Sequence, residues 1–211
     1  HGAFYNQDPV TLAYSIADLV KLTGETYYFG SVKGEEIADF AYNYQTQKNA
    51  LGAYTTSIAK TTSAYFYDAG VDDNGTPLDP DDDFARPAER ANGTHVTSET
   101  AMTRSDTYKV TDINSIDRTD DATIPNLQSE TFYKGDKSYE IADYSFNYQV
   151  GTMNIKSTSV FFYGDGLLRA SASDSDTAMT RSLGYKWGMD VNGHGAFYNQ
   201  DPVTLAYSIA D

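Results

Sequence analysis

The sequence predicts an all-β protein: an antiparallel β-sandwich or flattened barrel, built from two diverged half-repeats and completed by a terminal strand. Three observations lead to this prediction. Eighteen tyrosines and ten phenylalanines recur in short segments where apolar and polar residues alternate, as in strands with one covered face. Asn, Asp and Gly separate these segments, as turn residues do. No long segment has the 3.6-residue apolar period of an amphipathic helix.

Composition excludes several classes of protein. The 211-residue chain contains no cysteine, so disulfides and cysteine-ligated metals are impossible. Its formal charge of −15 would be repelled by nucleic acid and by anionic membrane surfaces. No apolar run approaches the ~20 residues of a membrane-spanning helix. We therefore expect neither a nucleic-acid partner nor insertion into a membrane.

The first predicted element is a strand that occurs twice. Residues 1–18 recur without change at 194–211, which gives a period of 193 residues. This identity fits the start of the next copy in a tandem array, a terminal strand copied to the other end of a subunit, or a local duplication. Large apolar residues share one face of the strand and could add to the sheet of another copy. These assembly residues are Val10, Leu12, Tyr14 and Ile16, and in the second segment Val203, Leu205, Tyr207 and Ile209.

Two related halves follow within the period. Residues 36–45 match residues 140–149 with only conservative differences, and residues 100–105 are identical to residues 177–182. We therefore divide the chain into a first half-repeat at 19–112, with an acidic insertion at 71–99, and a second half-repeat at 113–193.

The second half shows its strands most clearly. Alternation predicts strands at 142–150 and 153–163, joined by a turn at Gly151, and further strands at 168–173 and 179–189. Arg104 and Arg181 occupy matched positions in the two halves. We expect each to form an ion pair, with Asp39 and Asp143 or with Glu36 and Glu140 as the carboxylates.

The acidic insertion is the candidate metal site. Six aspartates fall between residues 72 and 83 with no Lys or Arg among them, and calcium binds six to eight oxygen ligands in such loops. A solvated acidic loop explains the same residues, and the spacing does not match an EF-hand. The candidate ligands are Asp68, Asp72, Asn74, Asp79, Asp81 and Asp83, with Ca²⁺ as the one cofactor considered.

Catalytic patterns are absent from the sequence. Three histidines are present, and His1 and His194 are the same residue in two copies of one segment. His95 lies in the insertion and fits an exposed loop residue. No nucleophile, zinc-hydrolase or phosphate-loop motif occurs, and nothing singles out a carboxylate pair for glycoside hydrolysis. We expect that the protein is not an enzyme.

Together, the acidic composition, the absence of cysteine, the strand-rich pattern and the duplicated end resemble repeat modules of large bacterial extracellular adhesin and fibre proteins. The strand-like duplicate also resembles subunits of donor-strand filaments. The resemblance implies a structural repeat or subunit of an extracellular fibre, surface filament or biofilm matrix, joined to copies of itself. A calcium-dependent carbohydrate-binding adhesin, which would contact glycans or cell surfaces, is the alternative. A glycoside hydrolase-like enzyme ranks third.

Overall fold

The computed structural model describes residues 5–7, 14–16, 21–75, 83–116, 126–152, 154–186, 198–200 and 207–209. Strands dominate this part of the chain, accompanied by short 3₁₀ helices. The elements are β1 Tyr5–Gln7, β2 Tyr14–Ile16, β3 Gly24–Phe29, β4 Ile37–Lys48, β5 Tyr54–Tyr67, β6 Val71–Asp72, β7 Phe84–Ala85, β8 Glu89–Arg90, β9 Met102–Tyr108, η2 Ile113–Ser115, β10 Leu127–Lys134, β11 Ile141–Tyr148, β12 Ile155–Tyr163, η4 Ala170–Ala172, β13 Met179–Lys186, β14 Tyr198–Gln200 and β15 Tyr207–Ile209.

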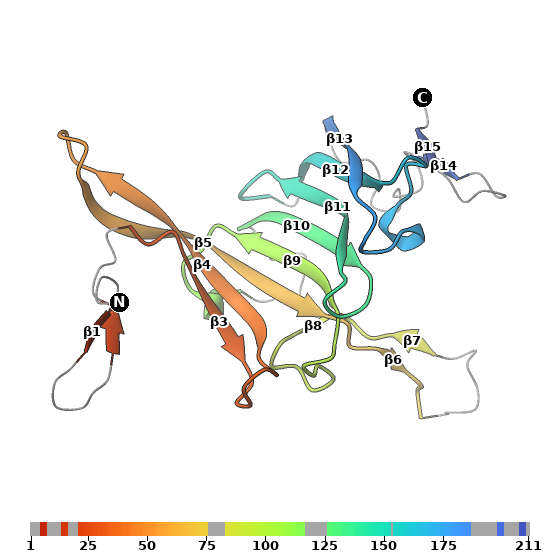
Figure 1. Ribbon diagram of the computed structural model, residues 1–211, viewed down its shortest axis with the longest axis horizontal. Helices are drawn as coiled ribbons and strands as arrows, with labels where there is room; N and C mark the ends of the chain where they lie inside the picture. Colours follow the sequence, from red (N-terminus) through yellow and green to blue (C-terminus); the bar gives the residue numbers. More distant parts are fainter. Residues whose placement is uncertain are drawn as a thin grey trace.

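One antiparallel sheet forms most of the fold (Figure 1). Its strands follow the order β13-β12-β11-β10-β9-β5-β4-β3, and β8 pairs with β5 beside this path. Apart from the excursion through β6, β7 and β8, each strand therefore pairs with the next strand along the chain. This meander is open, because among the described residues its first and last strands each pair on one side only.

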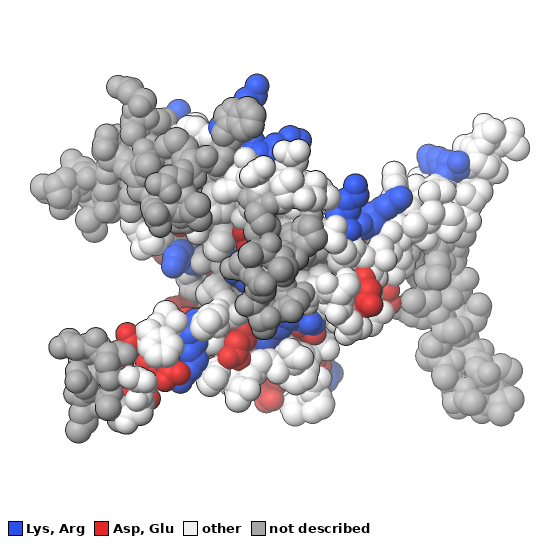
Figure 2. All heavy atoms as spheres, turned by 180° about the vertical axis from the view of Figure 1, so that it is seen from behind, with Lys and Arg blue, Asp and Glu red and all other residues white. Residues whose placement is uncertain are grey.

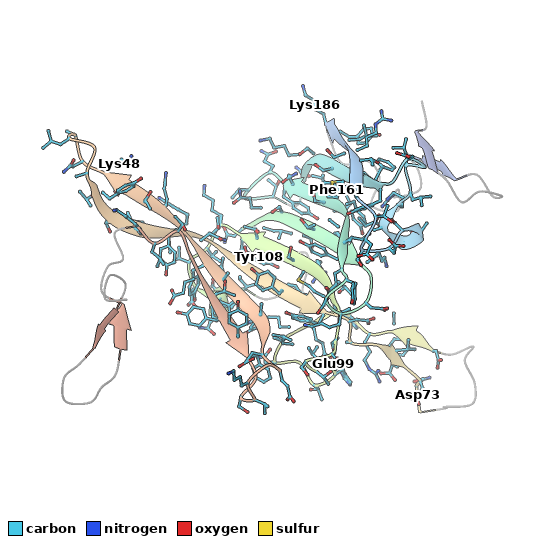
Figure 3. All side chains as sticks on the ribbon, in the orientation of Figure 1. Lys48, Asp73, Glu99, Tyr108, Phe161 and Lys186 are labelled. Carbon is cyan, nitrogen blue, oxygen red and sulfur yellow. The ribbon has the colours of Figure 1, made fainter. Side chains whose placement is uncertain are left out.

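The β4–β5 hairpin is the longest in the sheet and projects from it, with Lys48 close to its tip (Figures 1 and 3). Asn49 shapes the turn, because its Oδ1 accepts hydrogen bonds from the backbone N–H groups of Leu51 and Ala53, at 2.9 and 3.1 Å. Gly52 adopts a φ of 79°, which glycine tolerates best. The β11–β12 hairpin is shorter and ends at the turn that the sequence predicts around Gly151.

The main core covers one face of the central strands. Tyr108 and Leu127 are at most 1% exposed, and η2 adds the buried Ile113. The predicted alternation is confirmed in β11, where Phe146 and Tyr148 belong to this core. Figure 3 shows Tyr108 in the middle of the sheet.

Connecting segments pack on further parts of the sheet. Ala91, inside the acidic insertion, packs with Ile37 and Tyr67. In the other half, the prediction of a strand at 168–173 is wrong, because the chain forms η4 there. Arg169, the residue before η4, is 5% exposed and forms an ion pair with Asp143 of β11. This ion pair buries a carboxylate on the face that the alternation marks as polar.

The all-β class and the antiparallel pairing are confirmed. The described strands form an open sheet with three two-stranded ribbons, β1-β2, β6-β7 and β14-β15. No helix in the described part of the chain is both long and apolar enough to span a membrane.

Candidate functional site: the two edges of the sheet

The open edges of the sheet are β3 and β13. In the described residues β3 pairs only with β4, and β13 pairs only with β12. An edge strand presents backbone N–H and C=O groups to any extended chain that approaches it. These two edges are therefore the surfaces best suited to strand addition.

The edges also expose apolar side chains. Tyr28 of β3 is 63% exposed and Phe29 is 50% exposed, while Met179 at the start of β13 is 49% exposed. By comparison, Tyr133 of β10 and Met102 of β9, which lie on the internal β9–β10 pairing, are partly covered. Exposed aromatic residues along an edge strand are typical of an interaction surface.

Aromatic contacts support both β3 and the internal strand β10. Tyr27 stacks on Phe40 with ring centroids 4.6 Å apart, and Phe132 stacks on Tyr144 at 4.5 Å. A Glu on each strand accepts a hydrogen bond from a Tyr hydroxyl of the neighbouring strand: Glu25 from Tyr44 at 2.9 Å, and Glu130 from Tyr148.

Tyrosine hydroxyls also form hydrogen bonds between the two strands of each hairpin, at the end opposite the turn. The hydroxyl of Tyr67 donates to the carbonyl of Ala38 at 2.6 Å, and that of Tyr163 donates to the carbonyl of Ala142 at 2.5 Å. Burial of the phenol, with smaller effects from nearby carboxylates, raises the pKa of Tyr67 to about 12. Burial likewise raises the pKa of Tyr144 to about 12. These tyrosines are therefore neutral at ordinary pH and act as hydrogen-bond donors or packing groups.

The ion pairs differ from those that the sequence suggests. Asp39 pairs with Arg90 of β8, through Nε at 3.0 Å and Nη2 at 2.5 Å, and Asp143 pairs with Arg169 at 2.6 Å. Arg104 instead contacts Asp106 on its own strand, with Nε 3.2 Å from Oδ1. The arginines that pair with Asp39 and Asp143 are far from them in sequence, so alternation could not identify them.

Acidic residues meet on the internal β9–β10 pairing. Asp106 is fully buried and lies opposite Glu130, which is 6% exposed. The Arg104 guanidinium and the hydroxyls of Tyr108 and Tyr148 contact these carboxylates. One guanidinium group and two tyrosine hydroxyls thus stabilise the two neighbouring carboxylates.

The duplicated segment is described only in part. Backbone pairing joins residues 5–7 to 14–16 as β1-β2, and the second copy pairs identically as β14-β15. Each copy therefore forms a local two-stranded ribbon. The side chains of the eight predicted assembly residues lie outside the described residues.

The candidate calcium ligands are also described in part. Asp79 and Asp81 lie outside the described residues. Oxygens of Asp68 and Asp72 accept backbone hydrogen bonds at turns, and Asp72 lies 3.5 Å from Arg86. Among the described residues no group of three or more acidic or histidine side chains is placed to hold a metal. Figure 2 shows acidic and basic side chains side by side on the projecting β6-β7 ribbon.

His95 has a structural contact. Its Nδ1 lies 2.7 Å from Oε1 of Glu89, and its backbone N–H donates to Oε2 of the same residue at 3.1 Å. This hydrogen bonding lowers the pKa of the Glu89 carboxyl. The pair closes a loop of the insertion on the surface.

A hollow of about 290 Å³ lies beside the β3 edge, between the β3–β4 turn and residues 91–98. Apolar residues such as Val32, Ile37 and Val96 line it together with Glu35 and a few hydroxyls. None of the candidate calcium ligands in the described part of the chain lies on its wall.

Comparison of the chain with protein-family models, with curated proteins and with solved structures found no match. The sequence and the geometry described above are therefore the basis for a proposed function.

Proposed function

We propose that this chain is a structural repeat or subunit of an extracellular fibre or surface filament, joined head to tail to copies of itself. The observation that carries the proposal is the open sheet, which ends in two one-sided strands: β3 with exposed aromatic residues, and β13 with the exposed Met179. Two different edges of one molecule that fit each other produce an open linear assembly rather than a closed dimer.

The duplicated segment supports the same proposal. In a tandem array, residues 194–211 are the first residues of the next copy. In a non-covalent filament they are a strand that completes a neighbour. Burying the apolar face of this strand would remove on the order of 400 Å² from water, or ~10 kcal/mol gross, before the entropy of ordering the strand is subtracted.

Recurring contacts support an origin of the sheet in two diverged half-repeats. In the β3–β9 half the contacts are Tyr67 with Ala38, Tyr44 with Glu25 and Arg90 with Asp39. Their equivalents in the β10–β13 half are Tyr163 with Ala142, Tyr148 with Glu130 and Arg169 with Asp143. Each half contributes four strands to the sheet path. A sheet that already joins two such halves suits an array in which further copies follow.

The test is the mass and solution size of the intact native material, with and without a calcium chelator. A polypeptide with a 193-residue periodicity would establish a covalent array, and fibres that dissociate into single subunits would establish strand exchange. Collapse of either assembly on chelation would assign calcium to the acidic insertion. A native product of single-copy mass that remains monomeric at all concentrations would overturn the proposal.

Deletion of residues 194–211 tests the duplicated segment itself. If this segment joins copies, the shortened chain should aggregate or polymerise through an uncovered edge. A shortened chain that stays monomeric with an unchanged melting temperature would contradict a joining role for the segment.

A further inference from the structure

We propose that β13 of one copy pairs with β3 of the next copy in the register of the internal β9–β10 pairing, so that one antiparallel sheet continues through successive copies. This inference rests on the proposed function and names the partner of each edge, which is a second copy of this chain. It follows from the equivalence of each edge strand to one strand of the internal pairing.

The outer strand β13 is equivalent to β9. Both begin within the identical sequence at 100–105 and 177–182. Each pairs with its preceding strand in the same register, with a shift at the same place. In β9 the pairs are Phe66↔Arg104 and Tyr67↔Met102; in β13 they are Phe162↔Arg181 and Tyr163↔Met179. The backbone N–H and C=O groups on the outer side of β13 therefore alternate along the strand in the same way as those with which β9 pairs with β10.

The outer strand β3 is equivalent to β10 in the same way. Their sequences are Glu-Thr-Tyr-Tyr and Glu-Thr-Phe-Tyr, and the register shifts directly after the third of these residues in both strands. The pairs are Glu25↔Tyr42 and Tyr27↔Phe40 in β3, and Glu130↔Phe146 and Phe132↔Tyr144 in β10. The backbone N–H and C=O groups on the outer side of β3 thus alternate in the same way as those with which β10 pairs with β9.

The internal register can therefore be transferred to the junction between copies. Within the chain the pairs are Arg104↔Phe132, Ser105↔Thr131 and Asp106↔Glu130. The equivalent pairs are Arg181 with Tyr27, Ser182 with Thr26 and Leu183 with Glu25 of the next copy. The alternating directions along the path make β13 and the next β3 antiparallel, as the transferred register requires.

Side chains that support the internal pairing have equivalents at the edges. The backbone N–H of Met102 donates to Glu140 at 3.0 Å, and the hydroxyls of Ser105 and Tyr133 lie 3.1 Å apart. At the junction the corresponding partners are Met179 with Glu36, and Ser182 with the exposed Tyr28. Covering Tyr28 and Met179 would remove apolar surface that the single copy leaves in water.

One difference between the two pairings favours the junction. Asp106 faces Glu130 in the internal pairing, whereas Leu183 takes the position of Asp106 in β13. The junction therefore sets one carboxylate, Glu25, opposite an apolar residue, and no like-charge pair arises. No cation is therefore needed there to neutralise two neighbouring acids.

Chain length permits this pairing in a tandem array. In the internal pairing, residues 109–126 connect the end of β9 to the start of β10, which lies beside it. Between copies the connection is residues 187–193 followed by residues 1–23 of the next copy, which is longer. It can therefore close the same turn with the duplicated segment inside it.

Disulfide trapping tests the register, because the chain has no cysteine of its own. Ser182→Cys and Thr26→Cys are both at exposed positions, so neither change should disturb folding. The two full-length variants, one of them labelled with ¹⁵N, are mixed and oxidised, and the mixed dimer is quantified by mass. Thr131→Cys is the matched control for Thr26→Cys, because Thr131 is the equivalent residue on a strand already paired with β9.

We expect on the order of tenfold more mixed dimer with Thr26→Cys than with Thr131→Cys, because only pairing holds the two sulfurs within bonding distance. Equal yields would overturn the inference. A double variant carrying both exposed cysteines that forms its disulfide within one chain would also overturn it, because the sheet would then close on itself. Native fibres with 193-residue periodicity but no such crosslink would overturn the register and leave the proposed function standing.

Discussion

Replacing Asp143 with Asn should destabilise the protein far more than replacing Asp39 with Asn, although each aspartate pairs with an arginine at a corresponding place. The side chains of Arg169 and Asp143 are 6% and 10% exposed, whereas those of Arg90 and Asp39 are 27% and 13% exposed. Loss of the Asp143 charge removes the carboxylate that lies 2.6 Å from the Arg169 guanidinium at a place that water hardly reaches, which costs about 3–5 kcal/mol. Water can reach Arg90 and replace part of its partner, so the Asp39 change should cost roughly 1–2 kcal/mol.

Urea denaturation followed by tyrosine and tryptophan fluorescence measures both free energies of unfolding. Asparagine keeps the size of aspartate, so a loss of packing does not obscure the comparison. Equal losses for the two variants, or a larger loss for Asp39→Asn, would show that burial does not set the strength of these pairs. The account of the polar face of β11 would then be wrong.

Three further predictions follow from packing, backbone conformation and titration. Leu127→Ala should cost about 2–5 kcal/mol, because Leu127 is fully buried, while Leu51→Ala at a 92% exposed turn should change stability by less than about 0.5 kcal/mol in the same denaturation assay. Gly135→Ala should lower the melting temperature, because φ is 117° and a Cβ atom would lie 2.4 Å from a backbone oxygen. In an alkaline titration followed by phenolate absorbance, Tyr67 and Tyr144 should ionise near pH 12. Their pKa is raised by folding, so their stabilising contribution is complete below the unfolded value of about 10 and is lost as the pH rises toward 12; ionisation of all tyrosines near pH 10 without unfolding would contradict this.

Much of the sheet could be predicted from local patterns. The strand at Ile141–Tyr148 and its return after Gly151 follow from alternation and a turn residue, both of which act over a few residues. The match between residues 36–45 and 140–149 indicated that two parts of the sheet would resemble each other. Their contacts do recur, from the stacked aromatic pairs to the tyrosine hydroxyls.

The errors arose where distant residues decide the environment. Asp143 was expected to pair with Arg104 or Arg181, but the segment that leads into η4 supplies Arg169 instead. Arg104 was expected to reach across the fold, yet it contacts Asp106 two residues away, because both point to the same side of one strand.

Sequence alone therefore determined the all-β class, the duplicated end, the positions of several strands in the second half and the likeness of the two halves, since strand period, turn residues and identity are local properties. Only the tertiary structure decided that the strands form an open meander, that β3 and β13 are its edges, and that these edges match the two sides of the β9–β10 pairing. Which strands lie at the edges depends on the order and register of the whole sheet. That order is set by the packing of residues far apart in the chain, which no local pattern records.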